Sequence, residues 1–414
     1  MATRATDHER YPTLSVEQAQ AQVLAAVQPL PAESLPLLEA LGRVLAEDIV
    51  AAEDIPPHAN AAMDGYALRH EDIAGASPEK PAWLQVVGEL PAGARATVQL
   101  RKGEAVRIMT GAPIPSGADT VVRFEDTHAE GMRVCILRDP GRGRNVRAAG
   151  EDVRRGEVAL AAGTLLRPQE LGMLAALGRV QVRVHRRPRV AILATGDELL
   201  TPEAPLSPGK IRDANSYSVA GQVLQAGGIP ILLGIARDSE RELRDKLEEA
   251  LALAVDLIVT SGGVSAGDFD LVKEVLRSLG RMEFWWVNMK PGRPLAFGTL
   301  GGVPLLALPG NPVSAMVAFH LFGRPMLYRL QGRSDVLPRA VFARLREPIE
   351  RKDGRRHYLR VRLLRADGVL EAELTGEQGS GILSSMTRSD GFAVIPEDFQ
   401  ALPAGSTVQV LLLE

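Results

Sequence analysis

The chain has 414 residues, a net formal charge of −3 and 45% hydrophobic side chains, so two to four domains with cores of their own are expected. The near balance of acids and bases argues against general nucleic-acid binding, which needs a basic face. Cys135 is the only cysteine, which excludes disulfide frameworks and leaves a buried structural thiol as the expectation. No apolar run is long enough for a membrane span or a signal peptide, so a cytoplasmic protein is expected.

Helical spacing predicts helices over Val16–Val27 and from about Ala32 to Asp48. The pattern changes at residues 55–57, where two prolines follow each other. Short β-like runs separated by Gly and Pro then predict a small β-rich module, with strands at Trp83–Val87, Ala105–Met109, Thr120–Phe124 and Arg133–Leu137. A helix at Pro168–Leu177 and a strand at Val180–His185 follow. We therefore expect a discontinuous helical domain, residues 1–57 and 148–185, interrupted by the β module of residues 58–147.

From residue 186 to 330 the pattern alternates between strand and helix. Strands are expected at Val190–Ala194, Ile229–Gly234, Asp256–Thr260 and Val303–Leu308, and helices at Arg241–Ala254, Leu271–Leu279 and Val313–Leu330. Such alternation predicts a doubly wound, mostly parallel sheet with helices on both faces. Residues 331–414 again contain β-like runs, at Tyr358–Leu364, Val369–Leu374, Phe392–Ile395 and Thr407–Leu413, and predict a small C-terminal barrel or sandwich.

Polar or glycine-rich residues follow each strand of the expected sheet. Glu198 comes after the first strand, Asp238 after the second, and the turns Ser261–Asp270 and Leu308–Ser314 after the other two. Ligands of such sheets bind beyond the carboxyl ends of the strands, so these groups are expected to meet in one crevice. Asp238 has an alternative role as a helix N-cap.

The turn Ser261–Asp270, with the sequence SGGVSAGDFD, combines two kinds of group. Its glycine-rich backbone precedes a predicted helix and aims N–H groups at one spot, which favours an anion. Asp268 and Asp270 would repel a phosphate by about 4 kcal/mol at roughly 4 Å and an effective dielectric near 20. A divalent cation between them removes that repulsion, so we expect a phosphorylated ligand bound with Mg²⁺.

Cations gather at three places in the chain. Lys290 and Arg293 lie on a stiff turn bounded by prolines and either hold an oxyanion or are surface charges on a hairpin. The runs Arg142–Arg147 and Arg351–Arg360 are either solvated surface or a rim that recruits anions. The sequence has no HExxH, G-x-S-x-G, P-loop or Rossmann pattern, which disfavours those enzyme classes.

Polar loops at residues 60–66, 109–113 and 150–152 are unspecific by themselves. Together with the strand-end turns, however, they form an ordered set of strings: AMDGYAL, RIMTGAP, NVRAAGEDV, TGDEL, SGGVSAGDFD, KPGRPLAFG and LPGNPVSA, with QGSGIL nearer the C-terminus. This set resembles the molybdopterin molybdenumtransferases, the MoeA-like family that is similar to the E domain of gephyrin. The resemblance covers nearly the whole chain.

The resemblance implies a cytoplasmic transferase of molybdenum cofactor biosynthesis. Such enzymes take adenylylated molybdopterin and molybdate, insert the metal at the dithiolene and release AMP, with Mg²⁺ required. The implied fold has a helical dimerisation domain, an inserted β module, a molybdopterin-binding α/β domain and a C-terminal β barrel. The implied partners are a second subunit, which shares the active site, together with molybdopterin adenylyltransferase and molybdoenzyme apoproteins or their chaperones, but no nucleic acid or membrane.

The resemblance also assigns roles to residues. It implies that Asp64, Thr110, Asp152 and Glu198 are catalytic and that Glu198, Asp268 and Asp270 hold the metal. It places at the substrate Ser261, Gly262, Gly263, Ser265, Asp238, Lys290, Arg293, Pro309, Pro312 and Ser380. Arg293 stands where some members have lysine, and a planar fork holds an oxyanion differently from a point charge.

Three alternative functions remain from the sequence. A molybdopterin adenylyltransferase has a similar α/β domain but usually reads TGGTG where this chain reads SGGVS. A gephyrin-like scaffold would need additional segments for its partners. An unrelated Mg²⁺-dependent phosphotransferase would phosphorylate a sugar or an alcohol.

Overall fold

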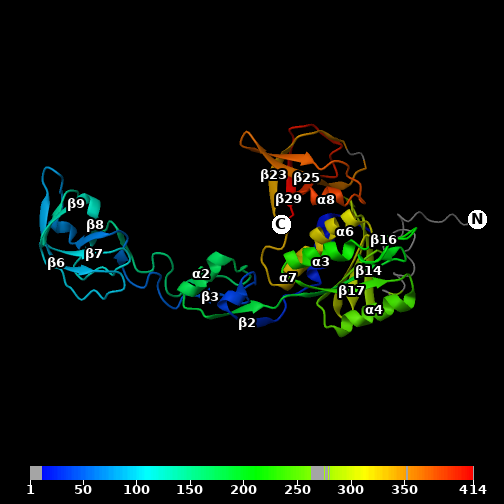
Figure 1. Ribbon diagram of the computed structural model, residues 1–414, viewed down its shortest axis with the longest axis horizontal. Coiled ribbons are helices and arrows are strands. Elements are labelled where there is room, and N and C mark those ends of the chain that lie inside the picture. Colours follow the sequence, from blue (N-terminus) through cyan, green and yellow to red (C-terminus); the bar gives the residue numbers. More distant parts are fainter. Residues whose placement is uncertain (1–11, 263–274, 276–277, 279, 351–352, 414) are drawn as a thin grey trace, which may run out of the picture.

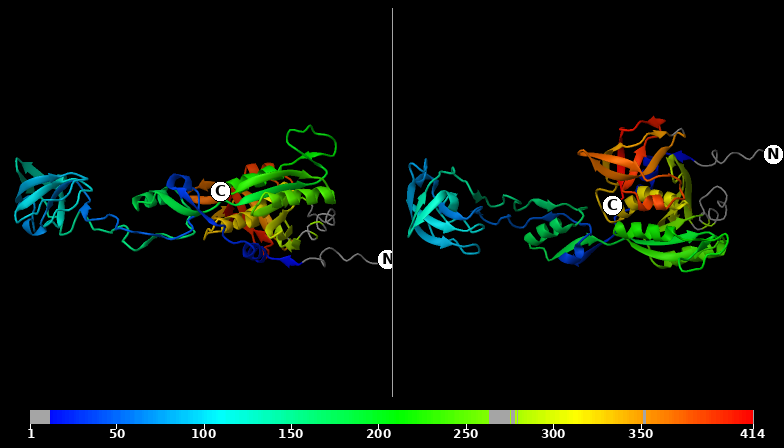
Figure 2. Two further views of the ribbon diagram at one scale, coloured as in Figure 1. Left: turned by 90° about the horizontal axis from the view of Figure 1, so that it is seen from below. Right: turned by 45° about the horizontal axis from the view of Figure 1, so that its top comes forward.

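The computed structural model describes residues 12–262, 275, 278, 280–350 and 353–413. Figure 1 shows an elongated molecule with the β module at one end and the α/β unit at the other, joined by a middle region that contains α2 (Pro168–Ala176). The C-terminal barrel packs on the α/β unit, and the views in Figure 2 show the same separation of the β module. No helix in the described ranges is long and apolar enough to cross a bilayer.

A seven-stranded sheet forms the centre of the α/β unit, in the order β1-β19-β21-β22-β18-β14-β17. The bounds are β1 Thr13–Leu14, β14 Arg189–Thr195, β17 Ile229–Ala236, β18 Leu257–Ser261, β19 Gly280–Val287, β21 Pro294–Leu300 and β22 Val303–Leu308. Strands β17, β14, β18 and β22 run parallel, which confirms the predicted sheet. The antiparallel strands β19 and β21 were not predicted.

Helices cover both faces of this sheet. Helices α1 (Val16–Ala25), α3 (Asn215–Gln225), α6 (Pro312–Ala318) and α7 (Arg324–Leu330) share a core with alternate residues of the strands. Helix α4 (Glu240–Ala252) packs on the other face through Leu243 and Leu247, and its N-cap Ser239 accepts a hydrogen bond from the Glu242 amide. Helix α3 was missed, because its Ser- and Gly-containing sequence has weak helix propensity. Most of the predicted helix Leu271–Leu279 lies outside the described residues.

The helix predicted over Val313–Leu330 is divided by a π-helical turn, η5 (Phe319–Gly323). The cause is Pro325, which has no N–H to offer the carbonyl of Leu321. The Gln20 side chain of α1 donates to that carbonyl at 3.0 Å instead. This bond helps to fix α1 on the α/β unit.

The N-terminal part of the chain differs from the prediction in two ways. Val16, Ala19 and Val23 of α1 join the core of the α/β unit, so this helix does not pack in a helical domain with α2. The second predicted helix is wrong, because residues 32–48 begin with the strand β2 (Ala32–Pro36) and the short turn η2 (Leu37–Ala40). Pro36 disfavours a helix because it has no N–H to donate and pushes the residue before it toward extended backbone. Strand β2 instead pairs along its full length with β13 (Gln181–His185).

The middle region, residues 31–57 and 148–185, is therefore built mainly from paired strands. Strand β3 (Ile49–Val50) pairs with β12 (Val158–Leu160), and α2 lies against a small core that includes Leu45, Leu166 and Leu174. The bounds of α2 agree with the predicted helix at Pro168–Leu177.

The β module contains a six-stranded sheet in the order β8-β5-β7-β6-β10-β9 and a separate pair formed by β4 and β11. The bounds are β4 Asn60–Ala61, β5 Gly65–Leu68, η3 His70–Asp72, β6 Ala82–Leu90, β7 Glu104–Ile108, β8 Thr120–Arg123, η4 Phe124–Asp126, β9 Thr127–Glu130, β10 Arg133–Ile136 and β11 Val146–Arg147. Apolar clusters cover both faces of its sheet. Cys135 is a buried free thiol, and burial raises its pKa.

The C-terminal domain is a small barrel, as predicted. Its strands are β23 Ala340–Leu345, β24 Ile349–Glu350, β25 Arg356–Ala366, β26 Val369–Leu374, β27 Gly391–Ile395, β28 Ala401–Leu402 and β29 Thr407–Leu412, with the helix α8 Ser384–Thr387. Pairing of β25 with β27 closes five of these strands into the barrel. Strand β20 (Met289–Lys290) of the α/β unit pairs with β25, which joins the two domains.

Candidate active site

A cleft of about 350 Å³ lies at the carboxyl ends of β14, β17, β18 and β22. Six of the predicted site residues line it: Glu198, Asp238, Ser261, Gly262, Pro309 and Pro312. Parallel strands bring their carboxyl ends to the same edge of a sheet, which explains why loops far apart in sequence meet here. Gly263, Ser265, Asp268 and Asp270 lie outside the described residues.

The loop after β14 carries Glu198 and depends on a glycine. Gly196 has φ +147°, and a Cβ at this position would lie 2.4 Å from Glu198 Oε2. The absence of a side chain therefore lets the Glu198 carboxylate fold back over the backbone. Glu198 is exposed at the cleft, where the carboxylate can reach a ligand.

The end of β18 approaches the same loop closely. Gly262 has φ +92°, and a Cβ there would lie 2.4 Å from the carbonyl oxygen of Thr195, so glycine is required. The Thr195 hydroxyl donates to the Ser261 carbonyl at 3.3 Å. Within the described ranges the buried Ser261 hydroxyl has no hydrogen-bond partner, which is expected where a bound ligand completes the bonding.

The turn before α6 carries Asn311 and brings the barrel to the cleft. Asn311 Nδ2 donates to the Ser380 hydroxyl at 3.1 Å, and the Val313 amide at the start of α6 donates to the Ser380 carbonyl at 3.1 Å. From α3, Asn215 Nδ2 donates to the Gly310 carbonyl at 2.8 Å. Ser380 therefore lies beside the cleft although it belongs to another domain.

Arg360 supports the Ser380 loop, a role that the sequence analysis missed because it placed this arginine in a surface run of cations. It is fully buried in β25, where its Nε donates to Ser385 Oγ at 3.0 Å and its guanidinium also donates to the Gly379 carbonyl at 3.0 Å. Burial lowers its pKa to about 10. An arginine between the apolar residues Leu359 and Val361 of a predicted strand is the signal that could have identified it.

Lys290 and Arg293 lie near this cleft but are not among the residues that line it. Lys290 Nζ is 3.4 Å from an Asp353 carboxylate oxygen, and the Arg293 guanidinium lies 4.9 Å from the centre of the Trp286 ring. Burial, and then the charge of Arg355, lowers the pKa of Arg293. Positive charges that lie near one another, here those of Lys290, Arg293 and Arg355, favour an anionic ligand. Asp353 already offsets part of this positive charge.

The described chain brings Asp64 and Thr110 together in the β module. The Thr110 amide and hydroxyl both donate to Asp64 Oδ1 at 2.7 Å, and these bonds lower the pKa of Asp64. Asp152 lies by a second cleft of about 460 Å³, which Asn60 and Arg147 also line. The β module and the α/β sheet lie at opposite ends of the molecule (Figure 1). One chain therefore does not bring the groups of its own β module to Glu198.

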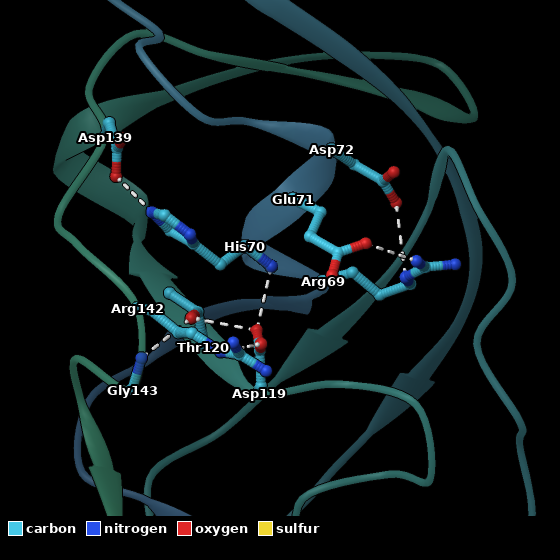
Figure 3. A network of polar contacts seen from close by, with 9 residues as sticks. All are labelled: Arg69, His70, Glu71, Asp72, Asp119, Thr120, Asp139, Arg142 and Gly143. Carbon is cyan, nitrogen blue, oxygen red and sulfur yellow. Dashed lines mark hydrogen bonds and ion pairs between the residues drawn. The ribbon is translucent and has the colours of Figure 1, made fainter.

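Other acids of the β module form structural ties. Figure 3 shows His70 Nε2 at 2.9 Å from Asp139 Oδ1, while the His70 amide donates to Asp119 at 2.8 Å. Arg142 Nε donates to the other oxygen of Asp119 at 3.0 Å. The Gly75 amide is the largest cause that lowers the pKa of Asp139. Arg142 thus forms an ion pair within the module, although its side chain is 71% exposed.

The oxygen donors of the cleft fit Mg²⁺. Among the residues the structure describes, no group of three or more His, Cys, Asp or Glu side chains could hold a metal ion. Mg²⁺ nevertheless needs only one or two carboxylates together with phosphate oxygens and water. Glu198 and Asp238 line one cleft and offer oxygen donors of this kind, so the donor set fits the ion.

Comparison with known proteins gives the class of the central domain. Residues 191–329 match a probable molybdopterin binding domain. These residues include the four parallel strands, apart from the first two residues of β14, and every described residue that lines the cleft. The fold and the cleft therefore define a multidomain protein built around an α/β domain of the molybdopterin-binding type.

The flanking regions match one family as well. Residues 14–178 match the MoeA N-terminal region (domain I and II), and residues 343–413 match the MoeA C-terminal region (domain IV). The chain is 41% identical to a molybdopterin molybdenumtransferase of Nostoc sp. over 92% of this chain and 88% of the relative, and 36% identical to that of Haemophilus influenzae over 96% and 98%. A solved molybdopterin biosynthesis moeA protein of Pyrococcus horikoshii superposes with a TM-score of 0.84 at 35% identity, covering 97% of this chain and 100% of that one. The chain belongs to the MoeA family.

Proposed function

We propose that this chain is a molybdopterin molybdenumtransferase of molybdenum cofactor biosynthesis. It inserts molybdate into adenylylated molybdopterin in a reaction that needs Mg²⁺ and releases AMP. The observation that supports this best is the cleft at the strand ends. It brings together the carboxylates of Glu198 and Asp238, the buried Ser261 hydroxyl, which has no hydrogen-bond partner among the described residues, and glycine-rich backbone. The names of the full-length relatives support the choice of reaction.

The substrate pyrophosphate is proposed to bind at the ends of β14 and β18. Mg²⁺ held by Glu198, with Asp268 and Asp270, would offset the negative charge of the pyrophosphate. Ser261 and the backbone of Gly262, Gly263 and Ser265 donate hydrogen bonds to its oxygens, and bonds to charged groups contribute roughly 1.5–3 kcal/mol each. Pro309 and Pro312 keep the second turn stiff, so little entropy is lost on binding. The residues thus position the reacting groups.

The oxyanion that enters the reaction is proposed to bind near Lys290, Arg293 and Ser380. Hydrogen bonds from Asn311 and Val313 hold Ser380 at the cleft, while Arg360 fixes the backbone of its loop. The Arg293 fork binds an oxyanion through two donors in one plane.

The active site is proposed to be shared within a homodimer. The β module, which carries Asp64 and Thr110, lies at the opposite end of the molecule from the α/β unit (Figure 1), so these residues and Asp152 are proposed to approach the cleft of a second subunit. Five apolar side chains of the middle region are exposed: Leu38, Leu41, Val50, Val158 and Val180. The Leu37 amide bonds the Val180 carbonyl and Val50 pairs with Val158, so most of these side chains come from paired segments of the middle region. Exposed apolar side chains gathered on one region are typical of an interface.

The other expected partners belong to the same pathway. We propose a cytoplasmic enzyme that receives its substrate from molybdopterin adenylyltransferase and passes the product to molybdoenzyme apoproteins or their chaperones. Direct contact with these proteins is expected to be transient, because both steps transfer a bound cofactor.

One assay tests the reaction. The protein is incubated with adenylylated molybdopterin, Mg²⁺ and molybdate, and AMP and metal-loaded cofactor are measured. AMP and loaded cofactor in equal amounts support the proposal. Consumption of ATP with free molybdopterin would instead identify an adenylyltransferase, phosphorylation of a sugar or alcohol a phosphotransferase, and peptide binding without turnover a scaffold.

A mixing experiment tests the shared site. Asp64→Asn and Glu198→Gln are each expected to be nearly inactive, but subunits reassorted from the two variants should recover about one quarter of wild-type activity. Random reassortment makes half of the dimers mixed. In each mixed dimer one of the two sites combines the intact Glu198 of one subunit with the intact Asp64 of the other. The control mixes Asp64→Asn with Thr110→Ala, two changes on the same β module, which should recover nothing. Recovery in the control, or none in the first mixture, would contradict a shared site.

A further inference from the structure

The backbone on both sides of Glu198 is held by two cations, Arg237 and Lys210, that do not line the cleft. Arg237, which follows β17, donates from NH1 to the Asp197 carbonyl at 3.1 Å and to the Leu199 carbonyl at 3.0 Å. Lys210 Nζ donates to the same Asp197 carbonyl at 2.5 Å. Three charge-assisted hydrogen bonds therefore bracket Glu198, and bonds of this kind are stronger than neutral ones.

The loops after β14 and β17 are also bonded to each other directly. The Asp197 amide donates to Asp238 Oδ2 at 3.3 Å, and the Asp238 amide donates to Asp197 Oδ1 at 3.2 Å. Arg237 itself is fixed, because its amide donates to Glu242 Oε2 at 2.9 Å in the first turn of α4. The chain of bonds thus runs from a helix, through Arg237, to the peptide groups beside Glu198.

The Glu198 loop is also held by β15 (Leu199–Leu200), which pairs with β16 (Ile211–Arg212), and by the Ile211 amide, which donates to the Glu198 carbonyl at 2.9 Å. The two cations add the bonds to the carbonyls of Asp197 and Leu199. Gly196 gives the backbone freedom, and Glu198 is exposed. Within the described residues neither Arg237 nor Lys210 forms an ion pair with the Glu198 carboxylate. The cations bind carbonyl oxygens instead, so the loop is fixed while the carboxylate stays available to a ligand.

We propose that Arg237, together with Lys210, is a positioning residue that holds the Glu198 carboxylate toward the strand-end cleft. The inference rests on the proposed function, because that function makes Glu198 a ligand of the divalent cation. A residue that acts in this way lowers the entropy that the site loses when the ion and the pyrophosphate bind.

The test compares three variants of the full chain. Arg237→Met removes the donors and keeps the length of the side chain, Arg237→Lys keeps the charge without the planar fork, and Arg241→Met is the matched control. Arg241 lies nearby on α4 with a side chain 92% exposed and a weak pair at 3.8 Å to Asp245. The readouts are hydrogen exchange of the amides at 198–200, the Kd for Mn²⁺ with inorganic pyrophosphate, and the melting temperature.

In Arg237→Met the exchange at 198–200 and the Kd for Mn²⁺ are each expected to rise about tenfold, which corresponds to the loss of one or two net hydrogen bonds. The melting temperature should stay at the wild-type value. Arg237→Lys should recover part of both effects, and Arg241→Met should behave as wild type. Wild-type exchange and metal affinity in Arg237→Met would overturn the proposal.

A double variant separates this proposal from the proposed function. If Arg237 acts through Glu198, adding Arg237→Met to Glu198→Gln should weaken Mn²⁺ binding no further, since the group being positioned is already lost. Additive losses would overturn the positioning role. If Glu198→Gln alone keeps wild-type metal affinity, the proposed metal site fails, and the exchange rates in Arg237→Met still decide whether Arg237 holds the loop.

Discussion

Replacing Glu198 with Gln is expected to lower kcat/KM for Mg²⁺-dependent release of AMP by about 10- to 100-fold, the effect of losing roughly 1.5–3 kcal/mol of charge-assisted interaction. The amide keeps the size of the side chain but removes its charge, so the folded structure should not change. The effect should appear mainly as a higher Mg²⁺ requirement. Initial rates of AMP release measured over a range of Mg²⁺ concentrations check this prediction.

Glu203 provides the control for that experiment. It lies five residues further along the same exposed segment and does not line the cleft. Glu203→Gln removes the same charge from the chain and should keep wild-type rates at every Mg²⁺ concentration. Full activity of Glu198→Gln, or an equal loss in both variants, would show that Glu198 does not hold the ion.

Acid is expected to destabilise the α/β unit through His320. This side chain lies in the π-helical turn with 1% exposure, and its ring meets that of Phe392 edge-on at 5.4 Å. Burial, and then the charge of Arg324, lowers its pKa from 6.5 to about 3. The unfolded chain therefore binds a proton below pH 6.5 that the folded chain refuses, and stability falls as the pH falls. Between pH 6.5 and 4.5 the free energy of unfolding should decrease by about 2–3 kcal/mol from this group.

The contribution of His320 can be isolated by substitution. His320→Leu fills a similar volume without a titratable group, so its urea midpoint, followed by tryptophan fluorescence, should depend less on pH over this window. His128→Gln is the control, since this histidine of the β module has a side chain 64% exposed, and it should keep the wild-type pH dependence. An equally steep loss of stability in His320→Leu would rule out His320 as the source.

Local sequence patterns predicted those elements whose local preference agrees with the structure that tertiary packing gives them. The strands β14, β17, β18 and β22 are apolar runs followed by turn residues, so both their extent and their parallel direction were expected. The second N-terminal helix was predicted wrongly, because the apolar spacing from residue 32 onward is helical while pairing with β13 makes the segment extended. Propensity is a weak signal, and tertiary pairing overrides it.

The long C-terminal helix shows a similar limit. Its apolar residues are spaced for one helix, but Pro325 leaves the Leu321 carbonyl without its usual donor. The donor is Gln20, which lies 301 residues away in sequence. A pattern within the segment cannot contain such a partner, so neither the π turn nor the docking of α1 was predicted.

The amino-acid sequence alone determined the kinds of group at the site and the edge of the sheet at which they gather, because the alternation of strands and helices and the residues of each turn are local properties. Which groups actually touch was decided by the tertiary structure. Asp64 meets Thr110 across the β module, Asn311 meets Ser380 across two domains, and Arg237 brackets Glu198 from a neighbouring loop. The physical reason is that hydrogen bonds act over about 3 Å in space, and only the folded chain brings residues so distant in sequence within that range.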